Sequence, residues 1–199
     1  VDAGVDVEFV SEEVLATMAD TVTPQGFIAV VHQFPTALKE IFAEDPKLVI
    51  ILEEVRDPGN LGTIIRVADS AGADAVIITG RSVDLYNPKV VRSTTGSLFH
   101  IPVTVGVELA DALAAARAAG LQVLAADVKG TDLPDAAAAG VLTKPTAWLF
   151  GNEARGLEDE HLGMADSAVR VPIYGEAESM NLATAASVLI YQSAFAQRA

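Results

Sequence analysis

The sequence contains no cysteine, which excludes disulfide bonds and metal sites built from thiolates. The three histidines, His32, His100 and His161, do not have the spacing of metal ligands, so we expect no metal centre. No apolar run approaches the roughly 18 residues that a membrane-spanning helix needs. We therefore expect no membrane partner and a cytoplasmic location.

Basic residues are also scarce in this sequence. The chain has 13 lysines and arginines against 27 aspartates and glutamates, a formal net charge of −14. Because lysine and arginine supply most non-specific affinity for nucleic acid, this balance excludes a protein that wraps RNA over a wide surface. Any RNA contact must be local or come from elsewhere. Five basic residues fall in or near the segments in which we expect function: Arg66, Arg81, Lys89, Arg92 and Arg155.

Aromatic residues make up only 6% of the chain although 51% of it is hydrophobic, so alanine, valine, leucine and isoleucine dominate. This composition is typical of parallel strands buried between helices. With 199 residues the chain can bury one sizeable core.

The clearest elements lie between residues 48 and 78. Residues 48–52 are a continuous apolar run, a turn follows at Asp57, and apolar residues then recur at helical spacing from Leu61 to Ala68. A second strand at 74–78 completes a βαβ unit, which implies parallel strands. Further strands are predicted at 7–10, 27–31, 101–105, 121–126, 146–150 and 168–171. We therefore expect an α/β fold, a parallel sheet flanked by helices on both faces.

The two ends of the chain carry separate expectations. The first residue is Val1 rather than methionine, and the short segment that follows is expected to be the end of something longer. A chain cut at a linker, a lost domain and a processed terminus all fit this pattern. The closing helix at 181–197 is apolar nearly all round, because Val188, Tyr191 and Phe195 add to its main apolar face. A partner subunit is one way to cover it.

The first candidate site segment follows the buried strand at 48–52. Asp57, Pro58, Gly59 and Asn60 form a tight turn, in which Asn60 can simply cap the next helix. Arg66 lies one and a half turns further on. It either extends to solvent or meets an anion.

The second candidate segment, Gly151-Asn152-Glu153, follows the strand that ends at Phe150. Gly151 lets backbone approach a ligand closely, and free N–H groups at a helix start can bind a carboxylate or polar ring atoms. Alternatively, Glu153 is only an acidic residue in a first helical turn. No dinucleotide fingerprint is present.

The third candidate segment runs from Val171 to Asn181 and is rich in turn-forming and polar residues. Its backbone can bind an adenine-like ring, although Ser179 and Asn181 can also act as helix caps. Ligands of open α/β sheets lie at the carboxyl ends of strands. We therefore expect the three segments to meet around one ligand.

Taken together and in this order, the three segments resemble the motifs of the SpoU/TrmH family of RNA 2′-O-ribose methyltransferases, within the SPOUT class. The resemblance covers the chain from about Phe27 onward. It implies that residues 1–26 are the remnant or linker of an N-terminal substrate-binding domain and that residues 27–199 are the SPOUT methyltransferase catalytic domain. It rests on Asp57, Pro58, Asn60, Gly62 and Arg66; on Gly151, Glu153, Gly156 and Leu157; on Pro172, Gly175, Ser179 and Asn181; and on Lys89, Arg92, Ser93 and Gly96 of a middle segment.

The resemblance implies a SPOUT-type fold with a C-terminal trefoil knot, a homodimer whose site uses both subunits, and S-adenosylmethionine as cofactor. It implies methyl transfer to a ribose 2′-hydroxyl of RNA, with rRNA favoured over tRNA. The residues carried over by position are Asn60, Arg66, Glu153, Ser179 and Asn181 for catalysis; Gly151, Asn152, Val171, Ile173, Met180 and Leu182 for the cofactor; and Lys89, Arg92 and Arg155 for RNA.

The proton acceptor and two other functions stay open. An arginine is a poor base, so we expect Arg66 to orient a phosphate or stabilise the developing alkoxide, while Glu153 or an RNA phosphate takes the proton. One alternative function is a catalytically inactive SPOUT-like protein that binds RNA or regulates. Another is an unrelated Rossmann-like nucleotide enzyme.

Overall fold

The computed structural model describes residues 4, 6–19, 21 and 23–199, and the chain forms two compact units, residues 1–34 and 35–199. Within the first unit, helix α1 (Glu12–Met18) is capped by Ser11, whose hydroxyl accepts a hydrogen bond from the N–H of Val14. The prediction of strands at 7–10 and 27–31 is wrong. A strand needs a neighbour that accepts its backbone hydrogen bonds, and the described part of this unit supplies none. Phe9 and Phe27 are correspondingly exposed.

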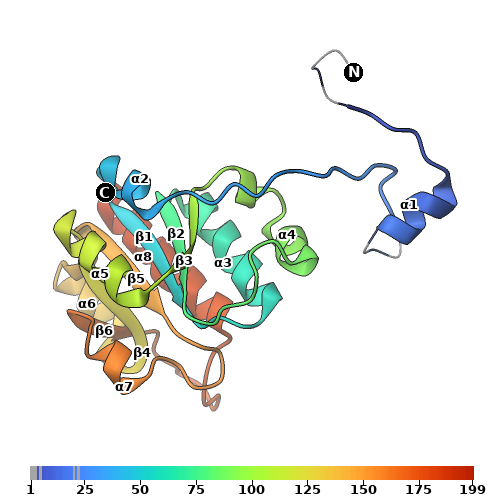
Figure 1. Ribbon diagram of the computed structural model, residues 1–199. Helices are drawn as coiled ribbons and strands as arrows, with labels where there is room; N and C mark the ends of the chain where they lie inside the picture. The colour runs from blue at the N-terminus through green and yellow to red at the C-terminus, as the bar shows by residue number, and fades with distance from the viewer. Residues whose placement is uncertain (1–3, 5, 20, 22) are drawn as a thin grey trace. The chain divides into compact units, whose positions relative to one another are not determined.

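The second unit is built on a parallel sheet of six strands in the order β3-β2-β1-β5-β4-β6 (Figure 1). The parallel α/β architecture predicted from the sequence is confirmed, and β3 lies at an edge, as its proline indicates. The strands are β1 (Leu48–Glu53), β2 (Ala75–Thr79), β3 (Val103–Val107), β4 (Gln122–Asp132), β5 (Thr146–Phe150) and β6 (Ser167–Arg170).

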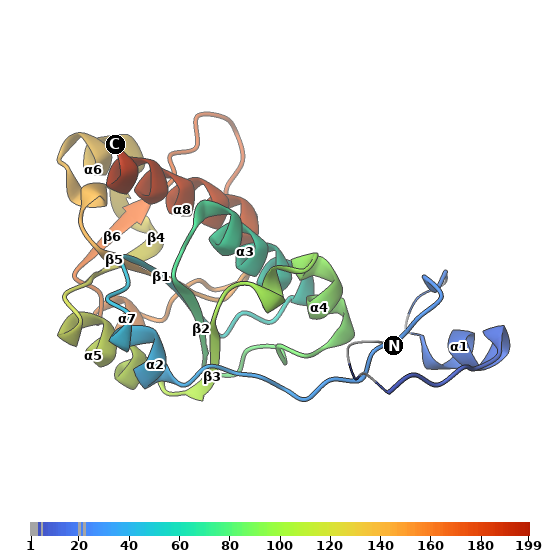
Figure 2. The ribbon, with the colours of Figure 1, turned by 90° about the horizontal axis from the view of Figure 1, so that it is seen from above.

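Helices cover both faces of the sheet (Figure 2). One face is covered by α3 (Pro58–Ala71), α4 (Pro88–Thr94), α6 (Leu133–Ala138) and α8 (Leu182–Arg198). The other face is covered by α2 (Leu38–Ala43), α5 (Leu109–Ala118) and α7 (Asp159–Leu162). Two short 3-10 helices, η1 (Ser97–Phe99) and η2 (Val141–Thr143), complete the unit. All residues of β1, β2 and β5 are buried, which explains their continuous apolar sequences.

Helix α3 begins and ends at residues suited to those positions. The Asp57 carboxylate accepts from the N–H of Asn60 at 2.7 Å and caps the helix, so Asp57 and not Asn60 is the N-cap. Pro58 occupies the first turn, where no N–H donor is needed. Gly72 ends the helix in the left-handed conformation. The Asn60 side chain is therefore available for another partner.

Strands β1 and β5 are neighbours whose following segments leave on opposite sides of the sheet. The chain passes from β1 into α3 on one face, and from β5 toward α7 on the other. Such a divergence opens a crevice at the carboxyl ends of the two strands, where ligands of open α/β sheets bind. The trefoil knot stays a prediction. Within the described residues, no helix is both long and apolar enough to span a membrane.

Candidate active site at the carboxyl ends of the strands

Three segments far apart in the sequence are joined by side-chain hydrogen bonds at this crevice. The amide of Asn60 donates to the Glu153 carboxylate at 3.4 Å, and the amide of Asn181 donates to Asn60 Oδ1 at 3.0 Å. The predicted convergence of the three segments is therefore confirmed.

Glu153 links the loop after β5 to the loop after β1. Its Oε1 accepts from the backbone N–H of Asp57 at 2.9 Å, and its Oε2 accepts from the N–H of Arg56 at 3.2 Å. The amides of Asn60 and Asn152 also donate to it, each at 3.4 Å. A carboxylate with four donors around it is well suited to hold loops together. Glu153 is exposed to solvent, and its hydrogen bonds orient the loop after β1 relative to the loop after β5.

The side chain of Asn181 makes two contacts, one that caps a helix and one within the site. Its Oδ1 accepts from the N–H of Thr184 and caps α8, while its amide nitrogen binds Asn60. Capping and site formation are thus performed by the same side chain.

A cavity of about 340 Å³ lies beside this cluster. The lining residues come from the middle of β4, the ends of β5 and β6, the loops that follow β5 and β6, and the first half of α8. Apolar residues form most of the wall. Of the residues predicted to bind a cofactor, five line it: Asn152, Val171, Ile173, Met180 and Leu182. Ser179, predicted as catalytic, lines it as well. Within the described residues, His, Asp and Glu side chains form no group of three that could hold a metal.

Gly151 is not among the residues that line this cavity. A Cβ atom at this position would lie 2.5 Å from the carbonyl oxygen of Gly156, so the glycine is required by the crossing backbone. Asn152 and Gly156 exchange two backbone hydrogen bonds at 3.0 and 2.9 Å and close the loop between them. The reason for a glycine here is therefore contact with protein backbone rather than with a ligand.

Arg66 lies apart from these residues. It is exposed on α3, six positions after Asn60, which corresponds to about 9 Å along the axis and roughly 240° around it. Arg66 does not line the cavity, and among the described residues its guanidinium group has no hydrogen bond or ion pair. A single chain therefore joins Asn60, Glu153 and Asn181 without Arg66.

The residues predicted to bind RNA occupy two places. Lys89 and Arg92 are exposed on α4, which packs against α3 where Gly62 leaves room for Ser93. Arg155 lies in the loop that lines the cavity, and its guanidinium pairs with Glu54 and, at 3.4 Å, with Glu158.

Two residues at this site, Glu54 and Arg56, were not predicted from the sequence. Glu54 has a left-handed backbone with φ of 54°, which costs a residue other than glycine about 1 kcal/mol or more. Its carbonyl accepts from the Asn152 amide at 2.9 Å, and its carboxylate pairs with Arg155 and Arg56. A glutamate after a strand gives no signal of such a backbone, and the ion pair with Arg155 joins residues 101 positions apart.

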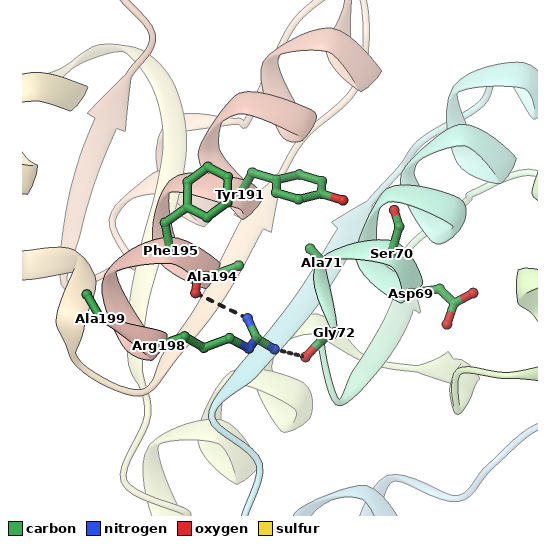
Figure 3. Close-up of a pocket in the computed structure, with 9 residues that line it drawn as sticks. All are labelled: Asp69, Ser70, Ala71, Gly72, Tyr191, Ala194, Phe195, Arg198 and Ala199. Atoms are coloured by element: carbon green, nitrogen blue, oxygen red, sulfur yellow. Dashed lines mark hydrogen bonds between the residues drawn. The ribbon is translucent and has the colours of Figure 1, made fainter.

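A second cavity lies between the C-terminal ends of α3 and α8 and contains none of the predicted site residues (Figure 3). Arg198 donates to the carbonyl groups of Gly72 and Ala194 at 2.9 and 3.2 Å, so one guanidinium caps two helix ends. The ring centroids of Tyr191 and Phe195, which are neighbours on α8, lie 5.5 Å apart in its wall, and Phe195 is 62% exposed. Arg198 therefore has a structural role beside this cavity, and the lining residues include no cluster of catalytic groups.

The fold and the first cavity define an α/β protein with a cavity at the carboxyl ends of parallel strands, beside a cluster of amide and carboxylate groups. The sequence model described as "SpoU rRNA Methylase family" matches residues 47–191. The model described as "RNA 2'-O ribose methyltransferase substrate binding" matches residues 2–37. The chain belongs to the SpoU rRNA methylase family.

Individual relatives agree with this assignment. The chain is 36% identical over 192 residues to the 23S rRNA (guanosine(2553)-2′-O)-methyltransferase RlmP of Bacillus subtilis, covering 96% of this chain and 73% of that protein. It is 37% identical to the 23S rRNA (uridine(2479)-2′-O)-methyltransferase of Streptomyces viridochromogenes, covering 85% of this chain and 60% of that protein. The AdoMet-bound rRNA methyltransferase of Sinorhizobium meliloti matches with a TM-score of 0.81 and 35% identity, covering 92% of this chain and 69% of that one.

Proposed function

We propose that this protein transfers a methyl group from S-adenosylmethionine to a ribose 2′-hydroxyl of RNA, with ribosomal RNA favoured over transfer RNA. The observation that carries the proposal is the cluster of Asn60, Glu153 and Asn181 beside a cavity lined by five of the predicted cofactor residues. The names of the Bacillus and Streptomyces relatives, both 23S rRNA 2′-O-methyltransferases, support rRNA as the substrate. With rRNA as the substrate, we also propose a cytoplasmic location.

The cavity suits the cofactor in size and chemistry. Its volume of about 340 Å³ falls within the range of roughly 300–1,000 Å³ that small-molecule sites occupy. Phe150, Val169 and Leu189 supply apolar wall for an adenine ring, while Asn152 and Ser179 supply polar groups. When bound, the cofactor supplies an activated methyl group on a sulfonium.

The residues of the chain then align the ribose and assist removal of its proton. Asn60 is held by hydrogen bonds with Glu153 and Asn181, which fix its amide beside Glu153, a residue that lines the cavity. Because four donors already surround Glu153, we assign it an orienting role and favour an RNA phosphate as the proton acceptor.

Arg66 enters this scheme through a second copy of the chain. A homodimer that places Arg66 of one subunit at the cavity of the other completes the catalytic cluster, and the exposed position of Arg66 on α3 supports this arrangement. The exposed ring of Phe195 on α8 also supports it, because α8 packs beside α3 and carries apolar surface that a partner can cover.

Affinity for RNA must come from a small area. No lysine or arginine precedes Lys39, so the segment matched by the substrate-binding model supplies no cationic side chain. The exposed Lys89 and Arg92, together with Arg66, are the candidates that remain on α3 and α4. We therefore propose local binding whose strength depends steeply on salt.

Two measurements test the proposal. Isothermal titration with S-adenosylmethionine, and with nicotinamide and adenine nucleotides, distinguishes a methyltransferase site from a nucleotide enzyme. Incubation of labelled cofactor with ribosomal and transfer RNA distinguishes an enzyme from an inactive RNA-associated protein. We expect binding of S-adenosylmethionine and label in ribosomal RNA. Binding without any transfer of label to RNA would leave the inactive protein as the better description.

A further inference from the structure

Glu54 occupies a backbone conformation that glycine would adopt more easily. Its φ of 54° lies in the left-handed region, yet the residue is neither a glycine nor an asparagine. Strained positions of this kind persist where surrounding contacts fix them, and they gather at functional sites. The contacts of Glu54 therefore indicate what the side chain does.

The side chain of Glu54 is well packed for a charged residue at a loop. It is 20% exposed, and Gly80 makes room for it, because a Cβ atom on Gly80 would lie 2.8 Å from Glu54 Cγ. The carboxylate pairs with Arg155 from one segment of the site and, at 3.4 Å, with Arg56 from the other. Glu54 thus bridges the loop after β1 and the loop after β5.

Backbone and side chain of Glu54 hold the same loop. The carbonyl of Glu54 accepts from the Asn152 amide at 2.9 Å, and Asn152 is also the residue whose backbone closes the loop onto Gly156. Asn152 and Arg155 both line the cavity proposed to hold the cofactor. A change at Glu54 therefore reaches the cavity wall through two separate contacts.

We propose that Glu54 is a positioning residue: it holds the 152–156 loop in the shape that binds the cofactor, and its strained backbone is retained because this side chain is needed there. The proposal rests on the assignment of the cavity to S-adenosylmethionine. It predicts that replacement of Glu54 by glycine lowers the affinity for the cofactor without lowering the stability of the protein.

The decisive variant is Glu54→Gly, which keeps the left-handed backbone and removes the carboxylate. We expect a melting temperature equal to or above that of the wild type, because the backbone strain is relieved. We expect the Kd for S-adenosylmethionine, measured by calorimetry, to rise about tenfold. A variant whose Kd is unchanged, or whose melting temperature and affinity fall together, would overturn the proposal.

Two further variants isolate the contact with Arg155. Arg155→Ala weakens cofactor binding, and the double variant Glu54→Gly/Arg155→Ala binds no more weakly than the worse single variant, because both remove the same link. Glu158→Ala is the matched control. It removes the other carboxylate on Arg155 but leaves Glu54 in place, and its Kd should stay within about twofold of the wild type. Full additivity of the two single variants would contradict the shared link.

A readout without cofactor separates this proposal from the assignment of the cavity. In the free protein, hydrogen exchange of the backbone amides of Asn152 and Gly156 should be faster in Glu54→Gly than in the wild type. If the wild type does not bind S-adenosylmethionine, the proposed function fails, while the exchange result still decides whether Glu54 holds the loop. An unchanged exchange rate at these two amides would by itself contradict the positioning role of Glu54.

Discussion

The carboxylate of Glu153 accepts a hydrogen bond at 2.9 Å from the backbone N–H of Asp57, 96 residues earlier in the chain. This contact joins the ends of two neighbouring strands and fixes Asn60, the third residue of α3, beside the cavity. The geometry of the site therefore depends on one charged side chain that serves several donors.

Replacement of Glu153 by glutamine should impair the site while the fold persists. One of the two carboxylate oxygens becomes an NH₂ group, which faces donors instead of accepting from them. We expect stability to fall by about 1 kcal/mol and methyl transfer to fall roughly a hundredfold. Thermal unfolding and a transfer assay with labelled cofactor measure the two effects. Glu176→Gln, in the exposed loop before Ser179, is the control and should match the wild type in stability.

Arg66→Ala should strongly reduce methyl transfer and leave cofactor binding within about twofold of the wild type, because Arg66 is proposed to act on the RNA and not on the cofactor. Loss of a group that stabilises developing charge typically lowers the rate by about 10² to 10³. Titration with S-adenosylmethionine and a transfer assay give the two numbers. Cofactor affinity lost in parallel with activity would refute the assignment.

Mixing subunits tests the origin of Arg66. Dimers formed from Arg66→Ala and Asn60→Ala subunits should recover activity at one of their two sites, since an intact cluster and an intact arginine then meet there. An inactive mixture, with dimer formation verified, would place the arginine in the same subunit as the cavity that it serves.

Binding of RNA should weaken steeply as salt rises, with Lys89 and Arg92 contributing to the slope. For single-stranded RNA the logarithm of affinity falls by roughly 0.7 per neutralised phosphate for each tenfold rise in salt. Lys89→Ala or Arg92→Ala should each reduce the slope by up to about one phosphate equivalent. Lys144→Ala, just before β5 at the amino ends of the strands, is the control. Strong binding that does not respond to salt would contradict this.

Gly72→Ala should destabilise the protein by about 1–2 kcal/mol, because Gly72 has φ of 67° and a Cβ atom there would lie 2.5 Å from Arg198 Nη2. In the double variant Gly72→Ala/Arg198→Ala the steric clash is absent. The loss of stability in the double variant should therefore be smaller than the sum of the losses in the two single variants. Chemical denaturation of the four proteins measures the difference. Strict additivity would show that the contact in Figure 3 carries no steric cost.

Asp69 should give part of the stability a pH dependence. The hydroxyl of Ser97, and to a smaller extent the ring of His100 at 3.1 Å, lower the pKa of the Asp69 carboxyl below its ordinary value, although partial burial opposes them. A lowered pKa contributes stability above the pKa of the unfolded chain, about 3.9, and loses it as pH falls through the lower folded value. Asp69→Asn should therefore lie below the wild type at pH 6 and approach it below about pH 4. An equal difference at both pH values would exclude this linkage.

The sequence by itself determined the elements and most of the site membership. Continuous apolar runs at 48–52 and 146–150 can be stable only as buried parallel strands, and the turn and cap residues after them indicate where a ligand binds. These are local properties, so they can be read from neighbouring residues. Local patterns gave the wrong secondary structure at 7–10 and 27–31, where the β-forming residues have no partner strand in the described structure.

Only the tertiary structure decided how these residues act. It placed Glu153 among four donors, gave Gly151 a backbone neighbour in Gly156, and set Arg66 away from the cavity. It also put Glu54 in a left-handed conformation between two arginines. The contacts of Glu153 with Asp57 and of Glu54 with Arg155 join residues about 100 positions apart. The spacing of a sequence motif carries no information on the distances and angles that such contacts set.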